Sequence, residues 1–202
     1  MKTIIGEVYK ELIIENSVFC AFAKHIDSID EANKYLEHVK TVKEKANHYP
    51  YAYVLDNFTV QKASDDKEPQ KTAGHPIIDV LIKNDITNAI IIVARYFGGK
   101  KLGAGGLTRA YSDAVALAIA NASFGYLTEV SIIDFEVGYQ HINNVNKFFK
   151  DKQLTIETTF NENAHFIIKI PTNILNESKE FLVSLTAGSV NFINISSFKE
   201  FI

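Results

Sequence analysis

The residues with the clearest chemical potential form one basic, glycine-rich segment. Five of the ten glycines in this 202-residue chain fall within nine positions: Gly98, Gly99, Gly103, Gly105 and Gly106. The stretch from Arg95 to Arg109 contains four basic residues and no acidic one; the basic residues are Arg95, Lys100, Lys101 and Arg109. The backbone N–H groups of such a turn, together with these cations, suit a phosphate or another anion. The aromatic residues Tyr96 and Phe97 offer rings on which a base could stack.

Two well-known phosphate-binding motifs do not describe this segment. It is not a Walker loop, because no Gly-Lys-Ser/Thr follows Gly103, and it is not G-x-G-x-x-G, because Thr108 stands at the third glycine. The plain alternative is that the glycines only allow a tight connection between a strand and a helix. The residues alone leave both interpretations open.

A second polar cluster lies upstream of the glycines. Asp65, Asp66 and Glu68 place three carboxylates within four positions, which would suit Mg²⁺ or acid–base chemistry. The favoured interpretation is a solvated charged loop, or acids that pair with Lys62, Lys67 and Lys71. His48 suits the C-terminal end of a helix, and a place in a site beside the two aspartates is its alternative role.

Composition limits the class of protein. Hydrophobic residues make up 47% and charged residues 22%, which excludes disorder as the dominant state. The longest apolar run, 89–94, is far too short to span a membrane, and the N-terminus lacks a signal-peptide core. The single cysteine excludes an internal disulfide, and the histidines lack metal-ligand spacing. We expect a cytoplasmic protein with no metal, no cofactor and no membrane partner.

Net charge gives a weaker constraint. With 21 basic and 24 acidic residues the formal charge is −3, which argues against a protein that is basic over its whole surface. Any contact with nucleic acid would therefore depend on the local charge around the glycines.

The elements that must position these residues follow from hydrophobic periodicity. The first part of the chain predicts strands and helices in alternation, with a capping box at Ser28 and Glu31. The expected elements are strands over 2–9 and 17–24, a helix over 30–46, a strand over 51–55, a loop over 58–74, a helix over 76–82, a strand over 88–96 and a helix over 107–122. The glycine segment thus joins a buried strand to an alanine-rich helix.

The pattern restarts after Gly125. The remaining elements follow the order βαββαβ, which in about seventy residues is the ferredoxin-like order. We expect an α+β protein of two domains, 1–128 and 129–202.

The two polar segments resemble the signature of the IMPACT / YigZ family. Two motifs carry the resemblance: Ser64-Asp65-Asp66-x-Glu68-Pro69-x-x-Thr72-Ala73-Gly74-x-Pro76, and Arg95-Tyr96-Phe97-Gly98-Gly99-x-Lys101-Leu102-Gly103-x-Gly105-Gly106-Leu107-x-Arg109-Ala110-Tyr111. The family usually has glycine where this chain has Lys67 and Lys71, so the acidic loop is bulkier and less acidic here.

This resemblance carries expectations about fold and function. It implies an N-terminal domain like domain IV of elongation factor G, and a ferredoxin-like C-terminal domain like domain V of that factor. Eukaryotic relatives are translational regulators, so binding to RNA or the ribosome is the expected function. Two alternatives are an enzyme acting on a phosphorylated small molecule or nucleotide, and an adaptor that binds a translation-related protein.

The expected site residues fall into two groups, and none is expected to be catalytic. The predicted anion or nucleic-acid contacts are Arg95, Gly98, Gly99, Lys100, Lys101, Gly103, Gly105, Gly106 and Arg109. The residues predicted to line a neighbouring cleft are His48, Asp65, Asp66, Glu68 and Thr72.

Overall fold

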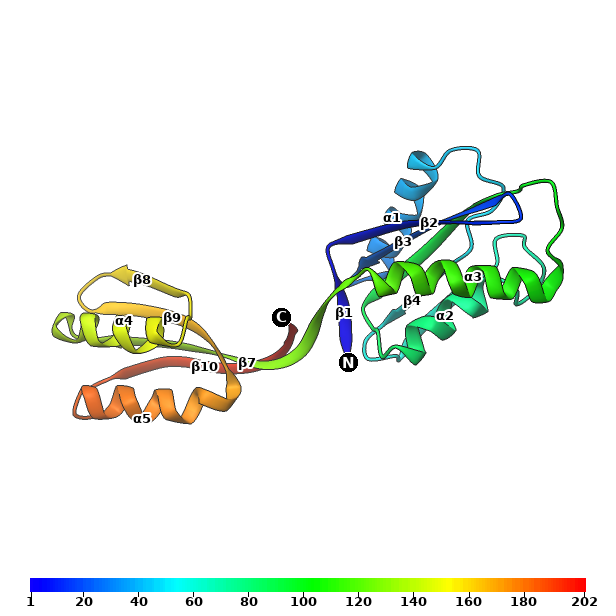
Figure 1. Cartoon of the computed structure of the whole chain (residues 1–202). Helices are drawn as coiled ribbons and strands as arrows, with labels where there is room; N and C mark the ends of the chain where they lie inside the picture. The colour runs from blue at the N-terminus through cyan, green and yellow to red at the C-terminus, as the bar shows by residue number, and fades with distance from the viewer. The chain divides into compact units, whose positions relative to one another are not determined.

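Two β-sheets and five α-helices make up the chain, which confirms the predicted α+β class (Figure 1). The structure, a computed structural model, describes residues 1–202 and divides into two units, Met1–Tyr126 and Leu127–Ile202. None of its helices combines the length and the apolar character needed to cross a membrane.

The first unit is built on a five-stranded antiparallel sheet in the order β2-β3-β6-β4-β5. Its elements are β1 (Lys2–Ile5), β2 (Glu7–Ile14), β3 (Ser17–His25), α1 (Ile29–Val42), β4 (Tyr51–Leu55), β5 (Val60–Ser64), α2 (Gly74–Lys83), β6 (Ala89–Tyr96) and α3 (Gly103–Ala120). β1 pairs with the first residues of β7 (Ser123–Val137).

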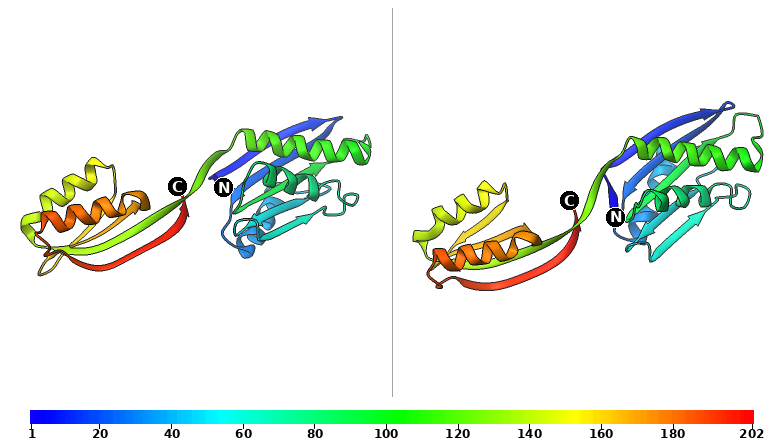
Figure 2. Two further views of the ribbon diagram at one scale, coloured as in Figure 1. Left: turned by 90° about the horizontal axis from the view of Figure 1, so that it is seen from below. Right: turned by 60° about the horizontal axis from the view of Figure 1, so that its bottom comes forward.

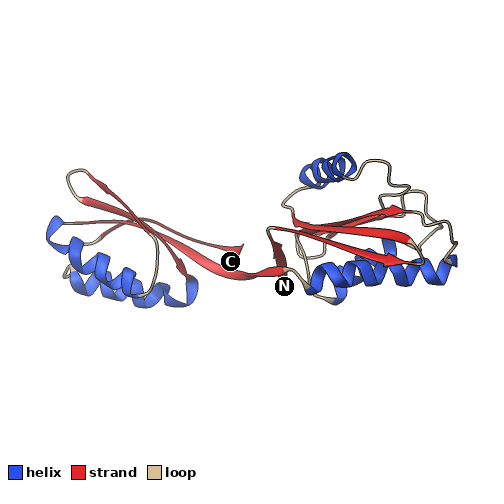
Figure 3. Ribbon diagram, turned by 45° about the horizontal axis from the view of Figure 1, so that its top comes forward, coloured by secondary structure: helices blue, strands red, loops and turns tan.

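Helices cover both faces of this sheet, α1 on one side and α2 with α3 on the other (Figure 3). The central strand β6 is therefore buried on both faces. Ile91 and Val93 pack in the cluster that includes α2 and α3, whereas Ile90 and Ile92 pack in the cluster that includes α1. Burial on both faces explains why this strand is a continuous apolar run rather than an alternating one.

The alanine-rich face of α3 explains how the glycine segment is held near the sheet. Ala110, Ala114 and Ala118 recur every fourth residue, and all three are buried in the core. Residues spaced by four lie on one side of a helix, and methyl groups let its axis approach the strands closely.

Four expectations for this unit differ from the structure. The helix predicted over 107–122 begins at Gly103, so Gly103, Gly105 and Gly106 belong to its first turn and not to a turn before it. The strand predicted over 2–9 is two strands that part at Gly6, and the first helix ends at Val42 rather than near residue 46. The prediction of a continuous loop over 58–74 is wrong, because β5 occupies Val60–Ser64 and pairs with β4. β5 is an edge strand whose three central residues are exposed, so it carries no apolar alternation.

The second unit has the predicted element order βαββαβ. The rest of β7 is followed by α4 (Ile142–Asp151), β8 (Ile156–Phe160), β9 (Ala164–Pro171), α5 (Leu175–Leu185) and β10 (Asn191–Phe201). The strands pair antiparallel in the order β10-β7-β9-β8, and both helices lie on the same face of this sheet (Figure 2). Phe135, Phe149 and Phe166 lie at the centre of the core between them.

Candidate functional site

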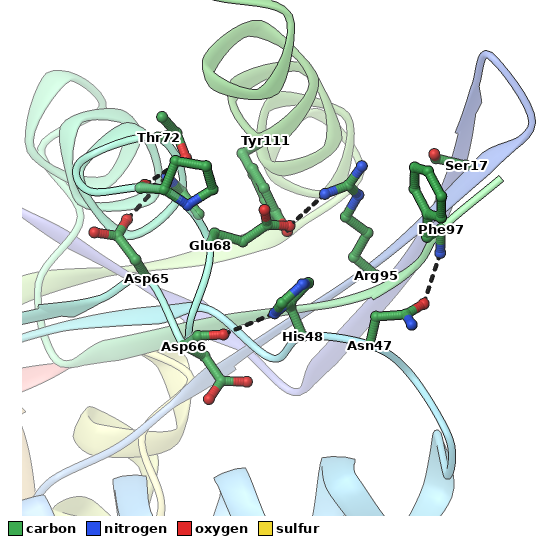
Figure 4. Close-up of polar contacts among 12 residues, drawn as sticks. Ser17, Asn47, His48, Asp65, Asp66, Glu68, Thr72, Arg95, Phe97 and Tyr111 are labelled. Atoms are coloured by element: carbon green, nitrogen blue, oxygen red, sulfur yellow. Dashed lines mark hydrogen bonds and ion pairs between the residues drawn. The ribbon is translucent and has the colours of Figure 1, made fainter. Parts of the chain in front are cut away.

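A buried ion pair ties the acidic loop to the end of β6. The Arg95 Nη1 group donates to Glu68 Oε1 at 2.6 Å, and the two residues are only 5% and 8% exposed. The same carboxylate oxygen accepts a hydrogen bond from the Tyr111 hydroxyl of α3 at 2.7 Å (Figure 4). Burial, and then the hydrogen bond to Glu68, raise the pKa of Tyr111, so this hydroxyl remains a donor. Three segments distant in sequence therefore meet at one carboxylate.

Arg95 has a further donor that this arrangement leaves unused. Its Nε is buried and has no hydrogen-bond partner, while the guanidinium carbon lies 5.4 Å from the Phe19 ring centre and 5.8 Å from that of Phe97. A buried N–H without an acceptor costs free energy, so this Nε is an unfavourable feature that the ion pair with Glu68 must offset.

His48 presents one ring nitrogen to this region. Its Nδ1 lies 2.9 Å from the backbone oxygen of Asp66, and since a carbonyl only accepts, Nδ1 carries the proton. In the neutral ring, Nε2 is then an acceptor. The backbone N–H of Tyr49 donates to Asp66 Oδ2 at 2.6 Å and so fixes the Asp66 side chain.

Asp65 does not face the same space. Its carboxylate accepts from the backbone N–H groups of Lys71, Ala73 and Gly74 at 2.7, 3.0 and 2.8 Å, and so it caps the start of α2. Partial burial acts to raise the pKa of the Asp65 carboxyl, but these three donors together outweigh it and hold that pKa below its usual value. Thr72 likewise turns its hydroxyl to the carbonyl of Pro69 at 2.6 Å.

The start of α3 opens onto the remaining space. Gly103 begins the helix with a φ of 70°, a conformation that side-chain-bearing residues adopt only with strain, and no side chain caps the helix. The first turn contains no acidic residue. The free N–H groups and the positive end of the helix dipole at this terminus therefore favour an anion.

Gly98 has a different, purely steric role. A Cβ at this position would lie 2.1 Å from the backbone of Asn16 in the β2–β3 turn. The Gly98 N–H instead donates to the Ser17 hydroxyl at 3.1 Å. This contact anchors the chain after β6 against the sheet.

A cavity of about 460 Å³ unites these features. Among the residues that line it are His48, Glu68, Arg95, Phe97, Lys101 and Gly103. Since Arg95 is neutralised by Glu68, the remaining positive charge at the cavity comes from Lys101 and from the helix terminus.

The other residues predicted for the site lie apart from this cavity wall. Lys100 pairs with Glu15 at 2.8 Å, and Arg109 is exposed on α3. Gly99, Gly105 and Gly106 belong to the same segment without lining the cavity, as do Asp65, Asp66 and Thr72 of the acidic loop. The structure adds Tyr111 to the residues of the site. The sequence held a signal for it, because Tyr111 lies four residues after the buried Leu107 and so on the same inner face of the helix.

Comparison with known proteins shows which family the chain resembles. Residues 15–119 match the Impact N-terminal domain family. IMPACT family member YvyE of Bacillus subtilis is 32% identical over 180 residues, which cover 88% of this chain and 83% of that protein. IMPACT family member YigZ of Escherichia coli is 29% identical over 135 residues, 65% of this chain and 66% of its own length.

A solved structure supports the fold of the whole chain. The crystal structure of a hypothetical protein, 24% identical in sequence, covers 96% of this chain and 97% of its own with a TM-score of 0.63. The matched family covers both segments on which the resemblance rests. This chain belongs to the IMPACT family.

Proposed function

We propose that this protein binds RNA, free or on the ribosome, and modulates translation. The observation that carries the proposal is the cavity at the start of α3, which Lys101 and an uncapped helix terminus line together. Both favour a phosphate, and phosphates are the groups that every RNA presents.

The charge balance of the cavity supports an anion as its ligand. Glu68 is the one carboxylate on the wall, and it is held by Arg95 and Tyr111. A second cation, Arg109, is exposed on α3 outside the cavity, and we propose that it contacts another phosphate of the bound RNA. The overall charge of −3 does not oppose this, because steering depends on local potential.

The family resemblance supports the connection with translation, since eukaryotic relatives are translational regulators. We propose that residues 1–128 form the ligand-binding domain and that residues 129–202 position it. The sheet order β10-β7-β9-β8 is that of a ferredoxin-like fold. It supports an analogy of this unit with domain V of elongation factor G, and of the first unit with domain IV.

A salt titration of RNA binding tests the proposal. Affinity for a single-stranded RNA should fall steeply with salt, with a log–log slope of about −0.7 for each phosphate neutralised. Lys101→Ala and Arg109→Ala should each weaken binding and reduce that slope by about 0.7. Lys83→Ala, an exposed lysine at the end of α2, is the matched control and should change neither. A flat salt response in the wild-type protein would refute the proposal.

One observation favours an enzyme acting on a phosphorylated molecule as the second candidate. His48 has its tautomer set by Asp66 and so offers Nε2 as an acceptor on the wall of the same cavity. That is the geometry a general base requires. A thermal-shift screen with nucleotides and Mg²⁺ would favour this candidate if a stabilising shift disappeared in His48→Gln. If the protein is instead an adaptor, a protein partner should remain bound to it during purification after nuclease treatment and at high salt.

A further inference from the structure

The cavity combines a positively charged end, formed by Lys101 and the start of α3, with an aromatic wall. Phe97 is 46% exposed although it lines the cavity, so a face or edge of its ring is open to a ligand. Its backbone N–H donates to Asn47 Oδ1 at 2.7 Å, which fixes this residue where β6 ends. The nearby guanidinium of Arg95 is the kind of cationic partner that aromatic stacking sites contain. An inorganic phosphate would use only one end of such a site.

The size of the cavity restricts the ligand further. About 460 Å³ accommodates one nucleotide but not the width of a double helix. Pro69, Leu102 and Leu107 add apolar wall, whereas His48 and Asn47 add polar atoms near the aromatic ring. An apolar slot with a few polar groups at its rim is the arrangement by which unpaired bases are bound.

We infer that the cavity holds one unpaired nucleotide of a single-stranded RNA. The phosphate lies against the start of α3 and Lys101, and the base stacks on Phe97. This inference rests on the proposed function and specifies its ligand. It predicts that RNA is bound through a flipped-out or terminal base and that a fully paired RNA is excluded.

The chain offers a direct probe of stacking because it contains no tryptophan. In Phe97→Trp the indole would be the only one, and stacking against a base should quench its fluorescence. We expect saturable quenching by a single-stranded RNA and by nucleoside monophosphates. The same RNA annealed to its complement, and inorganic phosphate, should leave the fluorescence unchanged.

An affinity measurement with labelled RNA completes the test. Phe97→Leu should weaken single-strand binding roughly ten- to a hundred-fold, the effect of losing one base–aromatic stack. Phe97→Trp should retain wild-type affinity. Phe160→Leu, which removes an aromatic ring exposed to 61% in the second unit, is the matched control and should have no effect.

The outcomes separate this inference from the proposed function. Salt-dependent RNA binding that persists in Phe97→Leu, or that produces no quenching in Phe97→Trp, would overturn the inference and leave the proposed function standing. Equal affinity for the single strand and the duplex would do the same. Quenching by mononucleotides without any affinity for RNA would overturn both, in favour of a nucleotide-binding enzyme.

Discussion

Replacing Glu68 by glutamine should destabilise the first unit strongly, although it removes only a charge. The substitution preserves shape but leaves the Arg95 guanidinium, 5% exposed, without its counter-ion. Removing one partner of a buried ion pair costs about 3–5 kcal/mol, because the remaining charge stays desolvated. Tyr111→Phe removes one hydrogen bond to the same carboxylate and should cost about 1.5–3 kcal/mol, the value for a bond to a charged group.

Amide hydrogen exchange is the appropriate assay, because it reports on the opening of each unit separately. The amides of Ile90–Val93 lie in the central strand β6 and exchange only when this unit opens. A loss of about 3–5 kcal/mol accelerates their exchange by roughly two to four orders of magnitude. The amides of β9 in the second unit serve as the internal reference.

A double variant separates charge burial from packing. Glu68→Gln combined with Arg95→Met removes both charges, so the double variant should be more stable than Glu68→Gln alone. Exchange in Glu68→Gln that differs from wild type by less than about threefold would mean that the pair is solvated, and the proposed role of this carboxylate would be wrong.

Further variants test the backbone around the site. Lys67 and Lys71 have φ of 68° and 63°, so replacing either by glycine should raise the urea midpoint by removing strain of about 0.5–1 kcal/mol. Asp65→Ala should cost about 1–2 kcal/mol at neutral pH by uncapping α2. Because the folded-state pKa of Asp65 is lowered, its contribution is present above the unfolded value of about 3.9 and is lost as pH falls through the folded value. Acid titration of stability should therefore be flatter in the alanine variant. Gly98→Ala should disrupt folding by a clash at 2.1 Å, whereas Gly105→Ala meets open space and should melt no lower than wild type in a thermal scan.

The elements of the sequence that are buried on a defined face could be predicted. The run Ile90–Val93 and the alanine repeat of α3 each imply a neighbour on the correct side, and the structure contains those neighbours. β5 could not be predicted in this way, because an edge strand with three exposed central residues has no periodic signal. Its pairing with β4 depends on tertiary contacts rather than on its own composition.

The sequence could name the polar residues of the candidate site, but it could not predict which of them pair with one another. The acids of the upstream loop were expected to be solvated or paired with lysines of the same loop. Glu68 instead reaches Arg95, 27 residues away, and Asp65 caps a helix through backbone groups six to nine residues further on. Such partners depend on chain topology, which a single sequence does not contain. The family usually has glycine where this chain has Lys67 and Lys71. That preference could have predicted a left-handed backbone at both positions, and the structure shows a positive φ at each.

The two tasks of Arg95 explain why a lysine would not replace it. The guanidinium must hold Glu68 through Nη1, and it also lies near the rings of Phe19 and Phe97, with its carbon 5.4 and 5.8 Å from their centres. A planar group with fixed donors can pair with a carboxylate and lie against aromatic rings at once. The compact ammonium of lysine could reach the carboxylate, but it has no planar face to lie against the ring of Phe97. Arg95→Lys should therefore retain more stability than Glu68→Gln yet bind RNA more weakly than the wild type, so that a structural effect and a binding effect are separated at one residue.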